Sequence, residues 1–188
     1  MHTPAAKAEL AVPIHAGDHI LGARDAPVVV VEYGDFECPS CAQAAPALQI
    51  VRQHFEPQVC LVFRHYPLTE IHPHAMLAAE AAEAAAAQGR FWPMHDLLFR
   101  HELHLGRDKL LYCARAAGLD MRQFERDIDA GVHRARVQAD IESGRASHIM
   151  STPAIFVNGE RCDVSFGMER LEEWIARILS SGRDSDRQ

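Results

Sequence analysis

The chain has 188 residues, of which 48% are hydrophobic, and it carries a formal net charge of −7. A chain of this size and composition buries enough apolar surface to fold as a compact unit, which excludes global disorder. Its negative charge provides no attraction to phosphate backbones or anionic lipid, so we expect neither nucleic acid nor a membrane as a partner. The N-terminal residues lack the unbroken apolar core of a signal peptide, and five cysteines, an odd number, disfavour a disulfide framework. We therefore expect a cytoplasmic protein, or a periplasmic one if the chain is a trimmed mature form.

The first part of the chain predicts a strand, a helix and a second strand. Residues 1–17 show no clear periodicity and are expected to form an N-terminal extension. The β-branched run Val28–Val31 predicts a strand that is covered on both faces. A Cys-x-x-Cys segment follows, and apolar residues then recur at helical spacing. Val59–Phe63 is a second continuous apolar strand, so residues 18–70 predict a right-handed β-α-β unit.

The second part predicts a helical block and then a return to strands. Residues 71–148 are rich in alanine and in helix start and stop signals. Ala154–Val157 then predicts a strand that leads into a hairpin turn and a final amphipathic helix. The order predicts an α/β fold in which a helical insertion, 71–148, divides one sheet domain into the parts 18–70 and 149–180. Residues 181–188 are expected to form a flexible tail.

The spacing of Cys38 and Cys41 carries the strongest chemical signal. Cys38 follows a predicted buried strand and begins a helix, so its sulfur is expected near unpaired backbone N–H groups and the positive end of the helix dipole. Both features stabilise a thiolate and lower the pKa of Cys38 below the ~8.5 of a free thiol. Cys41 lies one turn later, in position to attack a mixed disulfide on Cys38. A structural zinc site is disfavoured because it needs four ligands, and the sequence has no second Cys-x-x-Cys or Cys-x-x-His.

Four motifs, in their order along the chain, resemble the DsbA-like thiol-disulfide oxidoreductases. The resemblance extends from about Gly17 to Leu179 and implies a thioredoxin fold with an inserted helical domain. It also implies thiol–disulfide exchange as the activity. The motifs are Glu32-Tyr33-Gly34-Asp35-Phe36-Glu37-Cys38-Pro39-Ser40-Cys41, Phe63-Arg64-His65-Tyr66-Pro67-Leu68, Gln88-Gly89-Arg90-Phe91-Trp92-Pro93-Met94-His95-Asp96-Leu97-Leu98-Phe99 and Ser151-Thr152-Pro153-Ala154-Ile155-Phe156-Val157-Asn158-Gly159.

The resemblance implies roles for three residues outside the Cys-x-x-Cys segment. Pro153 matches the cis-proline that faces the two cysteines in thioredoxin folds, and Thr152 before it offers backbone groups to a bound peptide. Glu32 matches a buried acid beneath the cysteines, where desolvation raises the pKa of a carboxyl group and lets it relay the proton of Cys41. Without the resemblance, Glu32 can also be read as an edge glutamate that faces solvent.

Pro39 and Ser40, between the cysteines, complete the predicted substrate-binding set with Thr152 and Pro153. The best-known periplasmic members have Pro-His at these two positions. A histidine adds positive charge near the thiolate, whereas Ser40 offers only a hydroxyl or its backbone N–H. A strongly oxidising potential is therefore not expected.

The remaining cysteines and histidines are expected to be structural. Cys60, Cys113 and Cys162 are predicted to be small buried hydrophobes. If one of them is exposed, we expect it to be Cys162, because positions in a hairpin alternate between faces. The pairs formed by His72 with His74 and by His101 with His104 are predicted to be surface or capping histidines, so no metal is expected.

The sequence thus predicts a thiol-disulfide oxidoreductase that acts on protein or low-molecular-weight thiol and disulfide substrates, with a redox partner of unknown identity and no cofactor. Cys38 attacks, Cys41 resolves, Glu32 assists proton transfer, and Thr152 with Pro153 docks the substrate. Two alternatives are a glutathione-linked disulfide reductase on the same fold, and a non-catalytic module that binds a metal or a protein.

Overall fold

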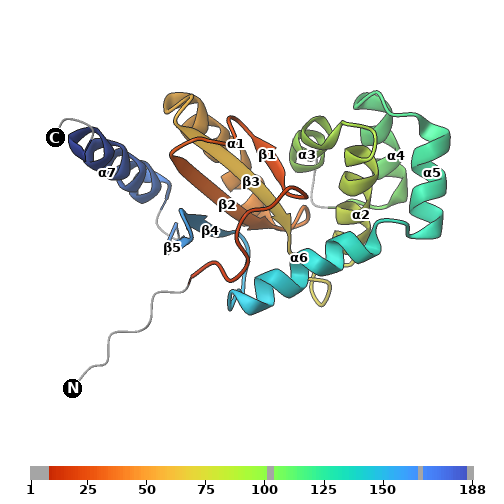
Figure 1. Cartoon of the computed structure of the whole chain (residues 1–188). Coiled ribbons are helices and arrows are strands. Elements are labelled where there is room, and N and C mark those ends of the chain that lie inside the picture. The colour runs from red at the N-terminus through yellow and green to blue at the C-terminus, as the bar shows by residue number, and fades with distance from the viewer. Residues whose placement is uncertain (1–8, 101–103, 165–166, 186–188) are drawn as a thin grey trace, which may run out of the picture.

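The computed structural model describes residues 9–100, 104–164 and 167–185. Within these ranges the chain forms one five-stranded sheet and seven helices (Figure 1). The strands are β1 (His19–Leu21), β2 (Val28–Gly34), β3 (Val59–His65), β4 (Ala154–Val157) and β5 (Glu160–Cys162). The helices are α1 (Pro39–His54), α2 (Ala75–Ala86), α3 (Phe91–Arg100), α4 (Arg107–Ala116), α5 (Met121–Ala130), α6 (Arg134–Ala146) and α7 (Glu169–Ser185). The predicted α/β class is confirmed.

The sheet has the strand order β1-β3-β2-β4-β5, so β2 lies at its centre. β2 pairs with β3 in parallel and with β4 antiparallel. Its β-branched residues suit a strand that is covered on both faces, since they pack well on a pleated surface. Glu32 is paired with Phe63 on one side and with Ile155 on the other. This register places a carboxyl group in the middle of the sheet.

Helices α1 and α7 cover one face of the sheet. Alternate residues of β2, including Val28 and Val30, point to this face, because successive side chains of a strand point in opposite directions. They join an apolar cluster with Ala44, Leu48 and Val51 of α1 and with Leu171, Ile175 and Leu179 of α7. Figure 1 shows α7 and the group α2–α5 at opposite ends of the molecule.

The N-terminal segment is held against the sheet by the buried side chain of Arg64. Its guanidinium binds both carboxylate oxygens of Asp18, at 2.8 and 2.9 Å, and donates to the carbonyl oxygens of Val12 and Pro13. Such a bidentate charged pair is among the stronger hydrogen-bonded arrangements in proteins. Residues 9–17, expected only as an extension, are therefore anchored, and residues 1–8 lie outside the described part of the chain.

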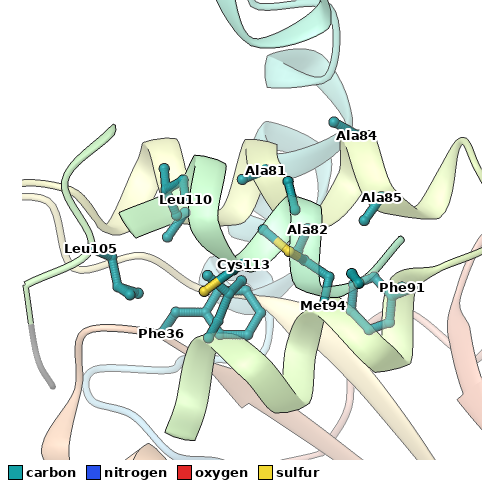
Figure 2. Packing of buried hydrophobic residues seen from close by; sticks show 14 of the residues in the cluster. Phe36, Ala81, Ala82, Ala84, Ala85, Phe91, Met94, Leu105, Leu110 and Cys113 are labelled. Atoms are coloured by element: carbon teal, nitrogen blue, oxygen red, sulfur yellow. The ribbon is translucent and has the colours of Figure 1, made fainter. Parts of the chain in front are cut away.

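The alanine-rich helix α2 forms the centre of the helical insertion. Its small side chains, among them Ala81, Ala82 and Ala85, are fully buried and allow larger apolar residues to fill the space opposite them. Figure 2 shows this cluster, with Met94 and Phe91 of α3 opposite α2. The helices α2–α5 thus contribute most of an apolar cluster that continues into the sheet domain, where Phe36 and both cysteines of the Cys-x-x-Cys segment belong to it.

The C-terminal helix is longer than the sequence predicted. α7 continues to Ser185 and so includes residues that were expected in a flexible tail, while 186–188 lie outside the described residues. Among the described helices, none is both long and apolar enough to span a bilayer.

Candidate active site

Cys38 and Cys41 lie at the start of α1, just beyond the carboxyl end of β2. Cys38 is the residue at which the helix begins: its backbone is extended, its N–H donates to the carbonyl oxygen of Asp35 at 3.1 Å, and its own carbonyl accepts from Ala42 at 3.0 Å. Pro39 occupies the first turn, where a missing N–H costs little because that group has no partner within the helix. The Cys38 side chain is 6% exposed, whereas Cys41 is fully buried.

The two sulfurs have opposite pKa shifts. Hydrogen bonding from Cys41 is the largest cause that lowers the pKa of Cys38 to about 5, and the side chain of Thr152 and the backbone N–H groups of Cys41 and Ser40 act in the same direction. The same contact between the cysteines, together with burial and the charge of Glu32, raises the pKa of Cys41 far above its ordinary value. At neutral pH the pair is therefore one thiolate, on Cys38, and one thiol, on Cys41.

The loop before β4 lies directly against Cys38. The Sγ atom of Cys38 is 3.4 Å from the carbonyl oxygen of Thr152, and the peptide bond between Thr152 and Pro153 is cis, the form that the resemblance implies. A groove of about 500 Å³ beside this contact is lined by Ser40, Thr152, Pro153 and Met168, among others. The structure thus brings three of the four predicted substrate-binding residues together at this groove, and the fourth, Pro39, is exposed next to Cys38.

Glu32 lies inside the molecule, on the face of β2 that packs against α1. It is 5% exposed, so the interpretation of Glu32 as an edge residue facing solvent is wrong. Desolvation, followed by the negative charge of Cys38, raises the pKa of Glu32 to about 8. At neutral pH the group is therefore mainly a neutral carboxylic acid.

Two further acids, Asp35 and Glu37, fix the loop that leads into Cys38. Asp35 accepts from the backbone N–H groups of Glu37 and Leu68, at 2.8 Å each, and pairs with the ring of His72 at 2.7 Å. Glu37 pairs with His74 at 2.9 Å. The sequence did not indicate the role of these acids. The expectation of a surface or capping histidine holds for His74, which is the residue at which α2 begins and has a side chain that is 39% exposed, whereas the side chain of His72 is 17% exposed. Each of the two rings also contacts a buried carboxylate. The contacts are with residues more than 30 positions away, so no local pattern signals them.

The other three cysteines have the structural settings that the sequence predicted. Cys60, Cys113 and Cys162 are all buried and free, and Cys162 is no exception to this. Burial is the largest cause that raises the pKa of each of them, so none has the character of a reactive thiolate.

One cluster that the sequence did not predict has metal-ligand chemistry. The side chains of His19, His65 and Glu83 bring three potential ligand atoms within 4.8 Å of one another. Both imidazoles bind the same Glu83 oxygen, at 2.7 and 2.9 Å, and the guanidinium of Arg136 lies 4.0 Å from that oxygen. Because the carboxylate already has three cationic or hydrogen-bonding partners, the cluster is accounted for as a buried polar network. His101 lies outside the described residues, and His104 is exposed.

Comparison with known proteins supports this assignment of the fold. A family model described as thioredoxin matches residues 15–177. Among curated relatives, the Na⁺/H⁺ antiporter NhaA 1 of Salinispora arenicola is 42% identical over 93% of this chain and 27% of its own length. The antiporter NhaA 1 of Mycolicibacterium vanbaalenii is 46% identical over 77% of this chain and 24% of its own length. The chain thus spans about a quarter of the length of the curated relatives it matches.

Solved structures share the fold of this chain, and one of them is described as an oxidoreductase. A thioredoxin-like oxidoreductase from Silicibacter pomeroyi is 26% identical, with a TM-score of 0.78 over 88% of this chain and 94% of its own. BdbD from Bacillus subtilis, in its oxidised form, is 24% identical, with a TM-score of 0.81 over 93% of this chain and 99% of its own. These neighbours share the thioredoxin fold and its helical insertion. The chain belongs to the thioredoxin family that the family model describes, and it shares its fold with these thioredoxin-like neighbours.

Proposed function

We propose that this protein catalyses thiol–disulfide exchange with protein or small thiol substrates, using Cys38 as the nucleophile and Cys41 as the resolving thiol. The observation that carries the proposal is the asymmetry of the pair. The pKa of Cys38 is lowered to about 5 at a site next to a groove, while the pKa of the buried Cys41 is raised. Perturbation of this kind beside a groove is typical of functional sites, and a thiolate is the reactive form in disulfide exchange.

The exchange proceeds in two displacements. The Cys38 thiolate attacks a substrate disulfide, whose S–S bond breaks, so one substrate sulfur leaves as a thiolate and the other is joined to Cys38. Cys41 then gives its proton to the ionised form of Glu32 and attacks the Sγ atom of Cys38. The Cys38–Cys41 disulfide forms, the second substrate thiol leaves, and the substrate has gained two electrons. When the same two displacements run backwards, from the Cys38–Cys41 disulfide, they form a disulfide in a dithiol substrate.

The charge of Cys38 determines at which step of the exchange Glu32 can accept a proton. The Cys38 thiolate is one of the two causes that raise the pKa of Glu32. Formation of the mixed disulfide removes that negative charge, so the pKa of Glu32 falls and more of it is ionised. A proton acceptor therefore becomes available at the step in which Cys41 must lose its proton.

Protein substrates are supported by the position of Thr152 beside Cys38. An extended peptide that places its sulfur at Cys38 also places its backbone beside Thr152, where main-chain hydrogen bonding of the kind made by an added β-strand is possible. The groove lined by Ser40, Pro153 and Met168 then receives neighbouring side chains. The relative from Salinispora arenicola that is described as an antiporter is about three and a half times as long as this chain, so the proposed activity is that of this site alone.

Two assays test the proposal in opposite directions: reduction of insulin by dithiothreitol, and oxidation of reduced ribonuclease in a glutathione buffer. The wild-type protein is expected to accelerate at least one of them, and Cys38→Ser to abolish that acceleration. Cys60→Ser is the matched control, because Cys60 is equally buried but lies outside the site. Comparable rates for the wild type and Cys38→Ser would favour a non-catalytic binding module. If insulin reduction is accelerated only when glutathione replaces dithiothreitol as the reductant, a glutathione-linked reductase is favoured.

A further inference from the structure

A small cavity lies between the sheet and helices α1 and α3, behind the Cys-x-x-Cys segment. Its walls include Glu32 of β2, Ala45 of α1, and Trp92 and His95 of α3. The cavity leaves about 10 Å³ for the centre of a water-sized sphere, which is enough for one ordered water molecule. Most of the other residues that line the cavity are apolar, whereas Glu32 and His95 are ionisable.

Two buried polar atoms on these walls have no hydrogen-bond partner among the described residues. They are Oε1 of Glu32 and Nε2 of His95. Buried polar atoms in native proteins are nearly always hydrogen-bonded, by protein or by an ordered water. One is on a carboxyl group and the other on an imidazole, and both border a cavity with room for a water molecule. A single water between them would satisfy both.

The other side of the His95 ring fixes which nitrogen can accept a proton. Nδ1 of His95 lies 3.0 Å from Oδ1 of Asp96, and a carboxylate requires a donor at that distance. The neutral ring therefore carries its hydrogen on Nδ1 and has a free lone pair on Nε2. The buried ring is surrounded by aromatic side chains, among them Phe36, Phe63 and Phe99, which hold it in place.

Asp96 connects this ring to the surface. Its side chain is 33% exposed, whereas that of His95 is only 4% exposed. Asp96 also accepts a hydrogen bond from Gln49 of α1 at 2.9 Å, and both residues line an open surface groove between α1 and α3. Hydrogen-bonding groups thus extend from the cavity beside Glu32, through His95 and Asp96, to solvent.

We propose that His95 and Asp96 form, with one water molecule in the cavity, a proton relay that connects Glu32 to solvent during resolution of the mixed disulfide. This inference rests on the proposed function and deepens it. His95 does not touch the reacting sulfurs, so it acts through Glu32 and positions the water. The helical insertion, from which His95 and Asp96 come, thereby contributes to the chemistry of the site.

The proton balance of the relay is simple. Glu32 passes a proton through the water to Nε2 of His95, and the ring releases its Nδ1 proton to Asp96 and then to solvent, which leaves the ring hydrogen on Nε2. When the Cys38–Cys41 disulfide is reduced again, Cys41 takes up one proton from Glu32, and a proton that enters from solvent by the reverse path returns the ring hydrogen to Nδ1. The ionised Glu32 accepts the proton of Cys41 as the Cys38–Cys41 bond forms and the substrate thiolate leaves. Each resolution therefore delivers one proton from Cys41 to solvent, and no oxidant is needed beyond the substrate disulfide already bound.

The charged groups around His95 keep its ring neutral between transfers. Burial is the largest cause that lowers the pKa of His95, and charges on His65 of β3 and His19 of β1 act in the same direction, while Asp96 opposes them. An imidazole with a lowered pKa holds an added proton only briefly before it releases it, so it suits a group that transfers protons better than one that stays protonated.

The test separates the two displacements with the aromatic disulfide DTNB. The first release of its coloured thiolate reports attack by Cys38 and depends on DTNB concentration, whereas the second reports resolution by Cys41 and does not. His95→Gln is expected to slow the second release about tenfold, below the roughly 10²- to 10⁴-fold range of direct general acid–base catalysis. The first release should be unchanged. Asp96→Asn provides a second, more exposed variant and should slow the same step.

Phe99→Leu is the matched control. It removes an uncharged ring from the same aromatic cluster, with ring contacts to Phe36, Phe63 and His95, and Phe99 does not line the cavity. It should change neither release. Equal slowing by Phe99→Leu, or slowing of the first release by His95→Gln, would show a packing role and overturn the relay.

A double variant tests whether His95 acts through Glu32. Groups that act in one path are not additive, so Glu32→Gln/His95→Gln should resolve no more slowly than Glu32→Gln alone. Multiplied effects would overturn the inference. If the wild type shows no second release, the proposed function fails, and the relay is decided by infrared spectroscopy. The carboxylic-acid band that is lost in Glu32→Gln should shift in His95→Gln and not in Phe99→Leu, and an unshifted band would refute the relay.

Discussion

The Sγ atom of Cys38 lies 3.4 Å from the carbonyl oxygen of Thr152, although 114 positions separate the two residues. The sheet register explains this contact. Tyr33 near the end of β2 is paired with Ala154 at the start of β4, so the residues that follow β2 and those that precede β4 meet at the same edge. A nucleophile and a backbone suited to substrate docking are thus placed together by strand pairing.

Alkylation of the reduced protein should be strongly asymmetric. We expect iodoacetamide to modify Cys38 first, with a rate that reaches half its maximum near pH 5, because the pKa of Cys38 is lowered to about 5. Cys41 should remain unmodified at neutral pH, since its pKa is raised and its side chain is fully buried. Mass spectrometry of peptides after timed quenching measures both rates.

The corresponding alanine variants provide the control for this asymmetry. Cys41→Ala should accumulate mixed disulfides with thiol substrates, because the attacking thiolate remains and the resolving thiol is gone. Cys38→Ala should not accumulate them. Equal alkylation of both sulfurs in the wild type, or an ordinary thiol pH dependence at Cys38, would contradict the assignment of roles.

The sequence predicted those parts of the site that are formed by residues close together along the chain. The spacing of Cys38 and Cys41 after an apolar strand was enough to place a thiolate at a helix start, and the strand and helix order followed from periodicity. The family resemblance brought Thr152 and Pro153 to the same site. Burial of Glu32 needed the register of three strands, which sequence patterns specify only indirectly.

The parts that the sequence could not predict depend on packing between distant segments. His95 and Asp96 appear in the sequence as residues of an amphipathic helix, and only the docking of α3 against α1 and the sheet places His95 opposite Glu32. Likewise, Glu37 gives no sign that its partners lie in the connection before α2 and in the segment before α4. These are tertiary contacts with no fixed sequence separation.

Glu37→Gln should destabilise the protein by about 2 kcal/mol, as expected for the loss of hydrogen bonds to a buried charged acceptor. The carboxylate of Glu37 accepts from the backbone N–H of Leu105 at 3.0 Å and from that of His74 at 2.7 Å. A glutamine amide can accept at only one of its two ends, so it leaves a buried donor without a partner. Urea unfolding at pH 7 measures the change, with the exposed Glu142→Gln as control.

The effect of Glu37→Gln should also depend on pH. Burial alone would raise the pKa of Glu37, but hydrogen bonds from Leu105 and His74 outweigh it and lower the pKa below the ordinary 4.5. The stabilisation is therefore present above pH 4.5 and is lost as the pH falls through the lowered native value. A difference that persists unchanged at strongly acidic pH would show that the carboxylate charge is not involved.

Glu32→Gln should stabilise the reduced protein increasingly as the pH rises from 4.5 to 8. The native pKa of Glu32 is about 8, whereas the unfolded chain has about 4.5, so the native state holds a proton that the unfolded state has lost. The free energy of unfolding of the wild type therefore falls with pH in this window, by up to about 1.4 kcal/mol per unit. Urea unfolding of both proteins across the window measures the difference, and a constant difference would mean that native Glu32 ionises normally.

The reduction potential depends on the same interactions that set the pKa of Cys38. Every contact that stabilises the Cys38 thiolate favours the reduced pair, and so makes the disulfide a stronger oxidant. Hydrogen bonding from Cys41 and the N–H groups at the start of α1 are already present. The position between the cysteines that can add a cation holds Ser40, which is exposed and uncharged.

Ser40→His should therefore raise the reduction potential and lower the pKa of Cys38 together. For a two-electron couple, about 30 mV corresponds to 1.4 kcal/mol, so one added charge contact is expected to shift the potential by that order. Equilibration with glutathione buffers measures the potential, and the pH dependence of alkylation measures the pKa. Gln43→His is the matched control: Gln43 is exposed, lines the same groove and lies on α1, but it is not between the cysteines. If Ser40→His changes neither quantity, or moves both in the same direction, the charge at Cys38 does not control the potential, and Glu32 or strain in the oxidised pair must set it.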